Sequence, residues 1–424
     1  MMQMADNSSN REVITGGDFK RMVAGAYSEF LLEYDAINRL SGAGHMPGTH
    51  VLHTMGAAVM PLVEAKDTGI GGLSRRVATA AVFGARGNAG VVLAQLFRGL
   101  AKGLSGKYQA TSSEFGKAFQ YGVLYAQRVI PGAAEPSIIT VAKAVAKGAY
   151  HAVRANMPIT EILEAAIEAG KRVLSDLGNE EAGACIMFTF LSGCLKGLDG
   201  HFVSPTVSLQ LGLGASQPGM PDPRNDLVRP YCVRFDIMNP KVSATELEKE
   251  LTEFSPFVLV RRKSTKGVQV HLHTDHPGQV LEQAIGWGPV KELHVTNMSE
   301  GHILASKDVL QKVALLGVAE NKAQAREMQD AGASVIVRGS EESCPSVAEL
   351  VSAAHSDLAA SYVMVAWSRD FWLAFRQARR LMGERVYLVL CETKVQQAAA
   401  FKAFDAGRSA ADNAEAMRQA ASLK

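Results

Sequence analysis

The sequence predicts a multidomain protein with an N-terminal all-α helical bundle or barrel, then a small α+β module and a C-terminal α/β domain. Apolar residues recur at three- and four-residue spacing from residue 17 to residue 200, as one face of a helix requires. Proline and glycine gather over 212–230, where they disfavour both helix and central strand. After residue 311, short apolar strands alternate with helices, which is typical of a parallel sheet covered by helices.

The N-terminal helical domain is assigned to residues 12–205. Its apolar periodicity predicts helices over 19–40, 73–83, 91–104, 112–129, 138–155 and 160–177. Strand-like alternation is almost absent from this part of the chain, so a helical bundle is expected here.

A linker over 206–230 precedes the two further domains. For the middle domain, 231–306, the pattern predicts strands at 231–237, 257–262, 267–273 and 291–296 and helices at 244–254 and 277–286. For the C-terminal domain, 307–424, it predicts strands at 313–318, 334–338, 362–366 and 385–390 and helices at 322–331, 346–354, 371–380 and 395–404.

Composition excludes several classes of protein. The 44 Lys and Arg residues nearly balance the 42 Asp and Glu residues, so there is no broad basic surface for nucleic acid or an anionic membrane. The five cysteines are too few and too scattered for a disulfide framework. No apolar run reaches the roughly 18 residues of a membrane span, and the polar residues 1–11 lack the apolar core of a signal peptide. We therefore expect a cytoplasmic protein without membrane insertion or nucleic-acid binding.

A glycine-rich loop, Gly84 to Gly90, interrupts the chain just before an apolar helix. Glycine lets a backbone approach a ligand closely, and the free N–H groups at the start of a helix attract anions. The loop could therefore cradle a phosphate. It could equally be a tight turn between two helices where only glycine fits. Spacing alone leaves both interpretations open.

A second candidate site lies in the middle domain. His271 and His273 are two residues apart in a predicted strand, so both project from the same face. Cys232 lies on another predicted strand of the same domain, and one sulfur with two nitrogens is a ligand set that suits zinc. The alternative is two surface histidines on a half-exposed strand and a buried cysteine.

Three histidines, His45, His50 and His53, cluster between the first two helical regions. His50 and His53 would share a helix face if a helix begins near residue 48. No Asp or Glu lies between Asp35 and Glu64. The sequence therefore favours solvated or hydrogen-bonded loop histidines over metal ligands.

These motifs, in this order, resemble the ATP-binding subunit of bacterial fatty-acid kinase, whose first domain is similar to the L subunit of dihydroxyacetone kinase. The stretch Gly84–Gly90 with Gln95–Gly99 resembles the family's G-A-R-G-N-S-G and Q-x-x-R-G, with Ala89 in place of serine. The stretch 135–141 resembles E-G-T-I-L-T-V, and 270–278 resembles V-H-V-H-T-x-x-P-G. The resemblance covers nearly the whole chain.

The resemblance implies ATP, Mg²⁺ and Zn²⁺ as cofactors and a fatty-acid-binding carrier protein as partner, bound by the C-terminal domain. The positions it implies for the nucleotide are Asn38, Gly48, Thr49, Gly84, Arg86, Gly87, Asn88, Ala89, Gly90, Ser137, Glu181 and Gly183. The positions it implies for zinc are Cys232, His271 and His273. The oligomeric state stays open, a homodimer included.

The sequence departs from this family in the loop that holds the metal. The family reads D-G-D-T-G-T-N-M there, and Gly48 with Thr49 fits its G-T. The two aspartates then fall on Gly44 and Met46. Mg²⁺ is normally held by carboxylates together with substrate phosphates, and neither residue supplies a carboxylate. Since metal positioning carries much of phosphoryl transfer, the departure argues against Mg²⁺ and against turnover.

Three functions follow from the resemblance. The first is a kinase that phosphorylates a carrier-bound fatty acid from ATP. The second is a catalytically inactive relative, a pseudokinase that binds nucleotide or serves as a scaffold, and the local chemistry favours it. The third, phosphorylation of dihydroxyacetone, rests on the first domain alone, and a shared fold does not carry substrate identity.

Overall fold

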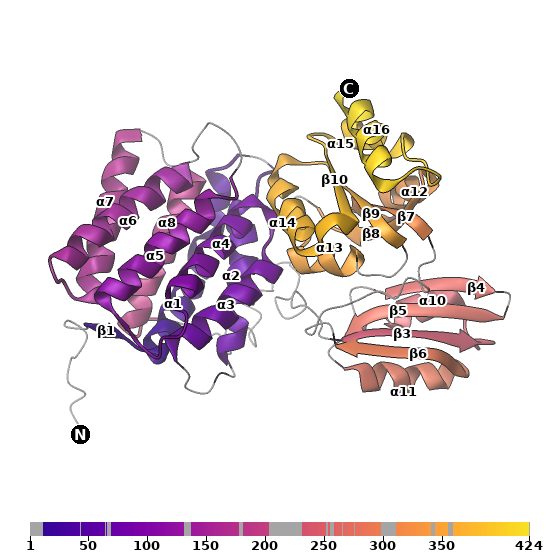
Figure 1. Cartoon of the computed structure of the whole chain (residues 1–424), viewed down its shortest axis with the longest axis horizontal. Helices are drawn as coiled ribbons and strands as arrows, with labels where there is room; N and C mark the ends of the chain where they lie inside the picture. The colour runs from indigo at the N-terminus through magenta and orange to yellow at the C-terminus, as the bar shows by residue number, and fades with distance from the viewer. Residues whose placement is uncertain are drawn as a thin grey trace. The chain divides into compact units, whose positions relative to one another are not determined.

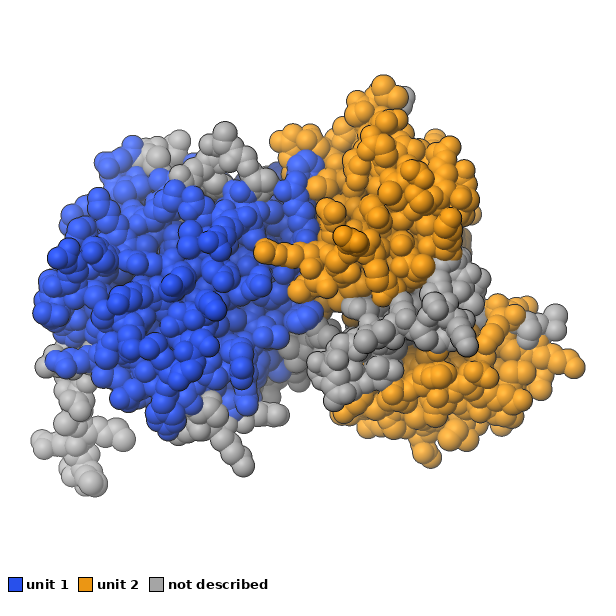
Figure 2. Space-filling model, in the orientation of Figure 1, with its two compact units in different colours: residues 1–227, 339–347, 370–377 blue, residues 228–338, 348–369, 378–424 orange. Residues whose placement is uncertain are grey.

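A computed structural model describes residues 12–42, 44–63, 65, 69–130, 137–177, 181–202, 231–251, 253–254, 258–264, 266–274, 276–297, 311–340, 344–354 and 359–423. The chain forms two compact units (Figure 2). Unit 1 comprises residues 1–227 with two short segments from the second half of the chain, 339–347 and 370–377. Unit 2 comprises residues 228–338, 348–369 and 378–424.

The first part of unit 1 is a helical domain, as predicted (Figure 1). Its helices are α1 (Gly16–Arg39), α2 (Pro47–Val63), α3 (Ile70–Gly84), α4 (Gly87–Gly103), α5 (Ser112–Gln127), α6 (Ser137–Arg154), α7 (Ile159–Leu177) and α8 (Ala182–Leu198). Two short strands, β1 (Val13–Ile14) and β2 (Ala110–Thr111), pair antiparallel beside them.

Local sequence fixes where two of these helices begin. Thr15 caps α1 in a capping box with Asp18, and Thr111 caps α5 in the same way with Glu114. Each box satisfies backbone N–H groups that the first turn of a helix leaves without partners. The polar residues before each apolar stretch therefore set the start of the helix.

Small residues allow α1 and α8 to approach closely. A Cβ added to Gly25 would come within 3.0 Å of the Gly193 carbonyl oxygen, and one added to Gly193 would meet the α1 backbone at Ala26. Larger residues at either position would push the helices apart. The interior beyond this crossing is filled by buried side chains, including Tyr27 and the edge-to-face pair of Phe97 and Phe190, whose ring centroids lie 5.5 Å apart.

The middle domain has six elements. They are β3 (Tyr231–Met238), α10 (Ala244–Leu251), β4 (Val258–Ser264), β5 (Gly267–Thr274), α11 (Pro277–Trp287) and β6 (Val290–Asn297). All pairings are antiparallel, in the order β4-β5-β3-β6. This is the split βαβ topology of ferredoxin-like modules. One face of the sheet packs on α10 and α11 through residues such as Phe235, Leu247 and Val280.

The C-terminal domain contains the predicted parallel sheet. Its elements are β7 (Gln311–Ala319), α12 (Lys322–Asp330), β8 (Ala333–Arg338), α13 (Val347–Ala354), β9 (Ala359–Ala366), the 3₁₀ turn Arg369–Phe371, α14 (Trp372–Met382), the 3₁₀ turn Gly383–Arg385, β10 (Val386–Leu390), α15 (Lys394–Lys402) and α16 (Ala410–Ser422). The strand order is β10-β9-β7-β8, with every pairing parallel. Among the helices of the described residues, none is both long and apolar enough to cross a membrane.

Candidate functional site

The glycine-rich loop joins α3 to α4 and packs against α2 (Figure 1). A Cβ added at each glycine would come within 3.0 Å of an α2 side chain: Ala57 for Gly84, His50 for Gly87 and Thr54 for Gly90. These three α2 residues lie on one face of the helix, because their spacing follows its turns. Close helix packing is therefore a sufficient reason for all three glycines, whatever the loop binds.

Arg86 lies at the centre of the loop and is 1% exposed. Its backbone N–H donates to Thr54 Oγ1 over 3.2 Å, and its guanidinium Nη1 donates to the carbonyl oxygen of Cys344. Arg86 also forms an isolated antiparallel bridge with Ser346, and the Val347 N–H donates to the Ala85 carbonyl over 3.0 Å. The segment 344–347 therefore lies along the loop like a short strand.

Two histidines of α2 stand next to this arginine. His50 and His53 are 2% and 1% exposed, inside the helix that begins at Pro47. The expectation of solvated loop histidines was therefore wrong for both, because α2 is buried on nearly every side. Burial, then the charge of Arg86 and then His50, holds the pKa of His53 well below its usual value. His53 is thus neutral at pH 7.

The segment 370–377 contacts the same end of α4. Asn88 Oδ1 accepts a hydrogen bond from the Leu373 N–H over 2.9 Å, at the first turn of α14. Gln95 Nε2 donates to Gln377 Oε1 over 3.1 Å, and both glutamines are buried. Asn88 and Arg86, which the sequence assigns to a phosphate cradle, thus both bond to other parts of the chain.

The loop before α2 carries the two positions where the family places aspartates. Gly44 is exposed and has a φ of +86°, and Met46 is half-buried. Between them, His45 Nδ1 lies 2.5 Å from Asp370 Oδ2. Sequence reasoning missed this carboxylate, because 325 residues separate the two side chains along the chain.

Asn38 has a structural partner at the start of α2. Its Oδ1 accepts from the Gly48 N–H over 2.8 Å and from the Thr49 N–H over 3.2 Å, while its Nδ2 donates to Thr49 Oγ1 over 2.8 Å. Asn38 therefore caps α2 from α1. The structure brings together three of the residues predicted to bind nucleotide, and it holds the metal-loop region rigidly against α1.

The remaining predicted nucleotide residues lie at two other helix starts. Ser137 is the first residue of α6. Glu181 is the exposed N-cap residue of α8, and Gly183 lies in the first turn of that helix. Glu181 makes no side-chain cap bond, so its carboxylate does not hold the helix start.

The candidate zinc residues are placed by the strand register of the middle domain. Cys232 of β3 pairs directly with His273 of β5, and Arg234 pairs with His271. Directly paired residues share a face, so the three positions lie together on the face opposite the helix-covered core. Their side chains lie outside the part of the chain that is described. Among the described residues, no group of three His, Cys, Asp or Glu could hold a metal.

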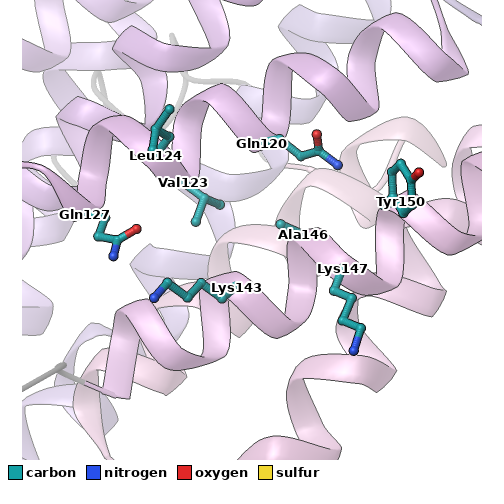
Figure 3. Close-up of a pocket in the computed structure, with 8 residues that line it drawn as sticks. All are labelled: Gln120, Val123, Leu124, Gln127, Lys143, Ala146, Lys147 and Tyr150. Carbon is teal, nitrogen blue, oxygen red and sulfur yellow. The ribbon is translucent and has the colours of Figure 1, made fainter.

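A surface groove of about 430 Å³ runs between α5 and α6 (Figure 3). Its floor is apolar, with Val123 and Ala146, and Lys143 and Lys147 lie along one side. None of the residues that the sequence analysis assigned to a ligand lines this groove. The chemistry of the site therefore rests on the glycine loop and its surroundings.

Comparison with known families matches three consecutive parts of the chain. Residues 47–179 match the DAK2 domain. Residues 229–304 match the middle domain, and residues 314–423 the C-terminal domain, of the FakA-like proteins, which take their name from fatty acid kinase. The chain therefore belongs to the FakA-like family of fatty acid kinase proteins, with a DAK2 domain at its N-terminal side, which confirms the resemblance.

Several bacterial proteins are similar over most of this chain. Protein YloV of Bacillus subtilis is 26% identical over 435 residues, covering 94% of this chain and 78% of YloV. The uncharacterized protein SERP0792 of Staphylococcus epidermidis is 26% identical over 383 residues, covering 83% of this chain and 69% of its own length. The uncharacterized protein SAB1090 of Staphylococcus aureus is 23% identical over 398 residues, covering 86% and 72%. These names state no reaction.

Proposed function

We propose that this chain is a fatty acid kinase-like protein that has lost phosphoryl transfer and retains a role as a nucleotide-binding or scaffold protein. Its proposed partner is a fatty-acid-binding carrier protein of the cytoplasm. The observation that carries the proposal is the loop before α2, where Gly44 and Met46 stand at the positions of the family's metal-binding aspartates. Mg²⁺ requires oxygen ligands, usually carboxylates, and phosphoryl transfer depends on the metal between the phosphates.

The structure adds one carboxylate to this region, but in a form that supports the same proposal. Asp370 Oδ2 is engaged by His45 Nδ1 at 2.5 Å. One carboxylate bound to an imidazole cannot replace two aspartates that clamp a metal against two phosphate groups. Neither Gly44 nor Met46 can contribute a second anionic oxygen.

The alternative is an active kinase that phosphorylates a carrier-bound fatty acid from ATP. It would require Asp370, Glu181 or a histidine of the loop to take over metal binding. A dihydroxyacetone kinase-like activity is a weaker alternative, because only the DAK2 domain favours it. Both alternatives require turnover, which separates them from the proposed function.

Nucleotide binding is expected to strengthen when Ala89 is replaced by serine. The family has serine at this position, and a hydroxyl that donates to a phosphate contributes about 1.5–3 kcal/mol. Ala89→Ser should therefore lower the Kd for ADP roughly ten- to hundredfold, measured by calorimetry. Ala101→Ser, also half-buried and on the same helix, is the matched control and should leave the Kd unchanged. Equal affinities for Ala89→Ser and the parent chain would leave the loop as a structural turn.

We also propose one zinc ion per chain in the middle domain. One thiolate and two imidazoles form a ligand set that zinc accepts, and the register places Cys232, His271 and His273 on one face of the sheet. Elemental analysis should find about one zinc per chain. Replacing all three residues by alanine should remove it, whereas His276→Ala, at the exposed start of α11, should not. A triple variant with normal zinc content would refute this site.

A further inference from the structure

The groups of the glycine loop that suit an anion are held by the chain itself. Arg86 is a buried cation whose Nη1 donates to the Cys344 carbonyl oxygen. A guanidinium forms hydrogen bonds roughly twice as strong to an anionic oxygen as neutral groups form with each other. The Cys344 carbonyl thus occupies a position on Arg86 that a phosphate oxygen would bind more strongly.

The surroundings of Arg86 also suit an anion. His50 and His53 are buried beside it, and the charge of Arg86 helps to lower the pKa of His53. Positive charge is therefore concentrated at this point of unit 1. An anion placed there would relieve the repulsion between these groups.

A second segment holds the start of α4 from the other direction along the chain. The Leu373 N–H donates to Asn88 Oδ1, and buried Gln377 pairs with Gln95 further along the same helix. At the loop before α2, Asp370 contacts His45. One short segment, 370–377, therefore reaches both the glycine loop and the region where the family binds its metal.

We infer that segments 344–347 and 370–377 form an internal latch that competes with the phosphates of a nucleotide for Arg86 and Asn88. Segment 344–347 takes the guanidinium, and segment 370–377 takes the Asn88 side chain. A nucleoside diphosphate that binds the loop displaces both contacts. The inference rests on the nucleotide-binding part of the proposed function, and it adds that this binding is controlled by the chain's own C-terminal half.

Amide hydrogen exchange of the full-length chain tests the latch directly. The reporters are the N–H groups of Val347 and Leu373, which donate to Ala85 and to Asn88. Saturating ADP should speed the exchange of both amides about tenfold or more, because each loses its acceptor. The Gly90 N–H, bonded within α4 to Arg86, should not become faster. Bound ADP with unchanged or stronger protection of both reporters would overturn the latch.

Variants of the latch provide a second test that leaves the loop untouched. Asp370→Ala with Gln377→Leu removes two latch contacts and should tighten ADP binding about tenfold. Arg376→Ala, at an exposed position on the same helix, is the matched control and should bind ADP like the parent chain. If the double variant binds no more tightly while the parent binds ADP, the latch does not compete.

These outcomes are distinct from a failure of the proposed loss of activity. ATP turnover by the parent chain would refute that loss and leave the exchange result to decide on the latch. Absence of ADP binding in the parent, the double variant and Ala89→Ser alike would refute the latch and leave a pure scaffold.

Discussion

Replacing Gly87 by alanine is expected to destabilise unit 1 by roughly 2–5 kcal/mol. The backbone at Gly87 has a φ of +56°, which costs a residue with a Cβ about 1–2 kcal/mol. The added Cβ would also come within 3.0 Å of His50 Nδ1. His50 is 2% exposed, so its ring has no room to move away. Denaturant unfolding of the parent and variant chains measures the difference.

Gly72→Ala is the control for this prediction. Gly72 lies within α3, and an added Cβ there would meet no atom within 4 Å. Because alanine favours a helix over glycine by about 1 kcal/mol, this variant should be slightly more stable than the parent. Equal stability of Gly87→Ala and the parent would contradict the packing account of the glycine loop.

Restoring both missing carboxylates is expected to produce kinase turnover where the parent shows none. Gly44→Asp with Met46→Asp returns the family's two aspartates to the loop before α2, where they can hold a metal against the phosphates of ATP. Gly44 has a φ of +86°, and aspartate is among the residues that adopt this region most readily. ATP turnover with Mg²⁺ or Mn²⁺ should rise at least tenfold above background.

The charge is separated from the shape by a second double variant. Gly44→Asn with Met46→Asn has nearly the same size and backbone preference but supplies no negative charge. It should remain inactive. If the aspartate variant folds and binds nucleotide but also stays inactive, the loss extends beyond the metal loop, and the scaffold role gains support.

The sequence predicts the three-part fold because most elements carry a clear period. The strands and helices of the middle domain alternate as predicted, and the C-terminal strands pair in parallel. Two helices of the bundle, α2 and α8, gave no amphipathic signal. Both are apolar on nearly all sides because they are buried on nearly all sides, and periodicity cannot identify such a helix. The alanine-rich helix α16 was missed for a similar lack of contrast.

The candidate site was predictable only where its residues are close along the chain. The glycine loop and the altered metal loop stand out in the sequence because each is a short motif. The contacts of Arg86 with Cys344 and of His45 with Asp370 depend on tertiary structure. No local pattern marks Asp370 as a neighbour of the first domain. The glycines illustrate the same limit, since spacing could not separate close packing from phosphate binding.

ATP turnover by the unmodified full-length chain tests the central claim most directly. The assay combines the chain with ATP, Mg²⁺ or Mn²⁺, and a fatty-acid-loaded carrier protein, and measures ADP and acyl phosphate formation. We predict no turnover above the level without the chain, because Gly44 and Met46 supply no metal ligand. Sustained, metal-dependent formation of acyl phosphate would contradict the account and would require a relocated metal site.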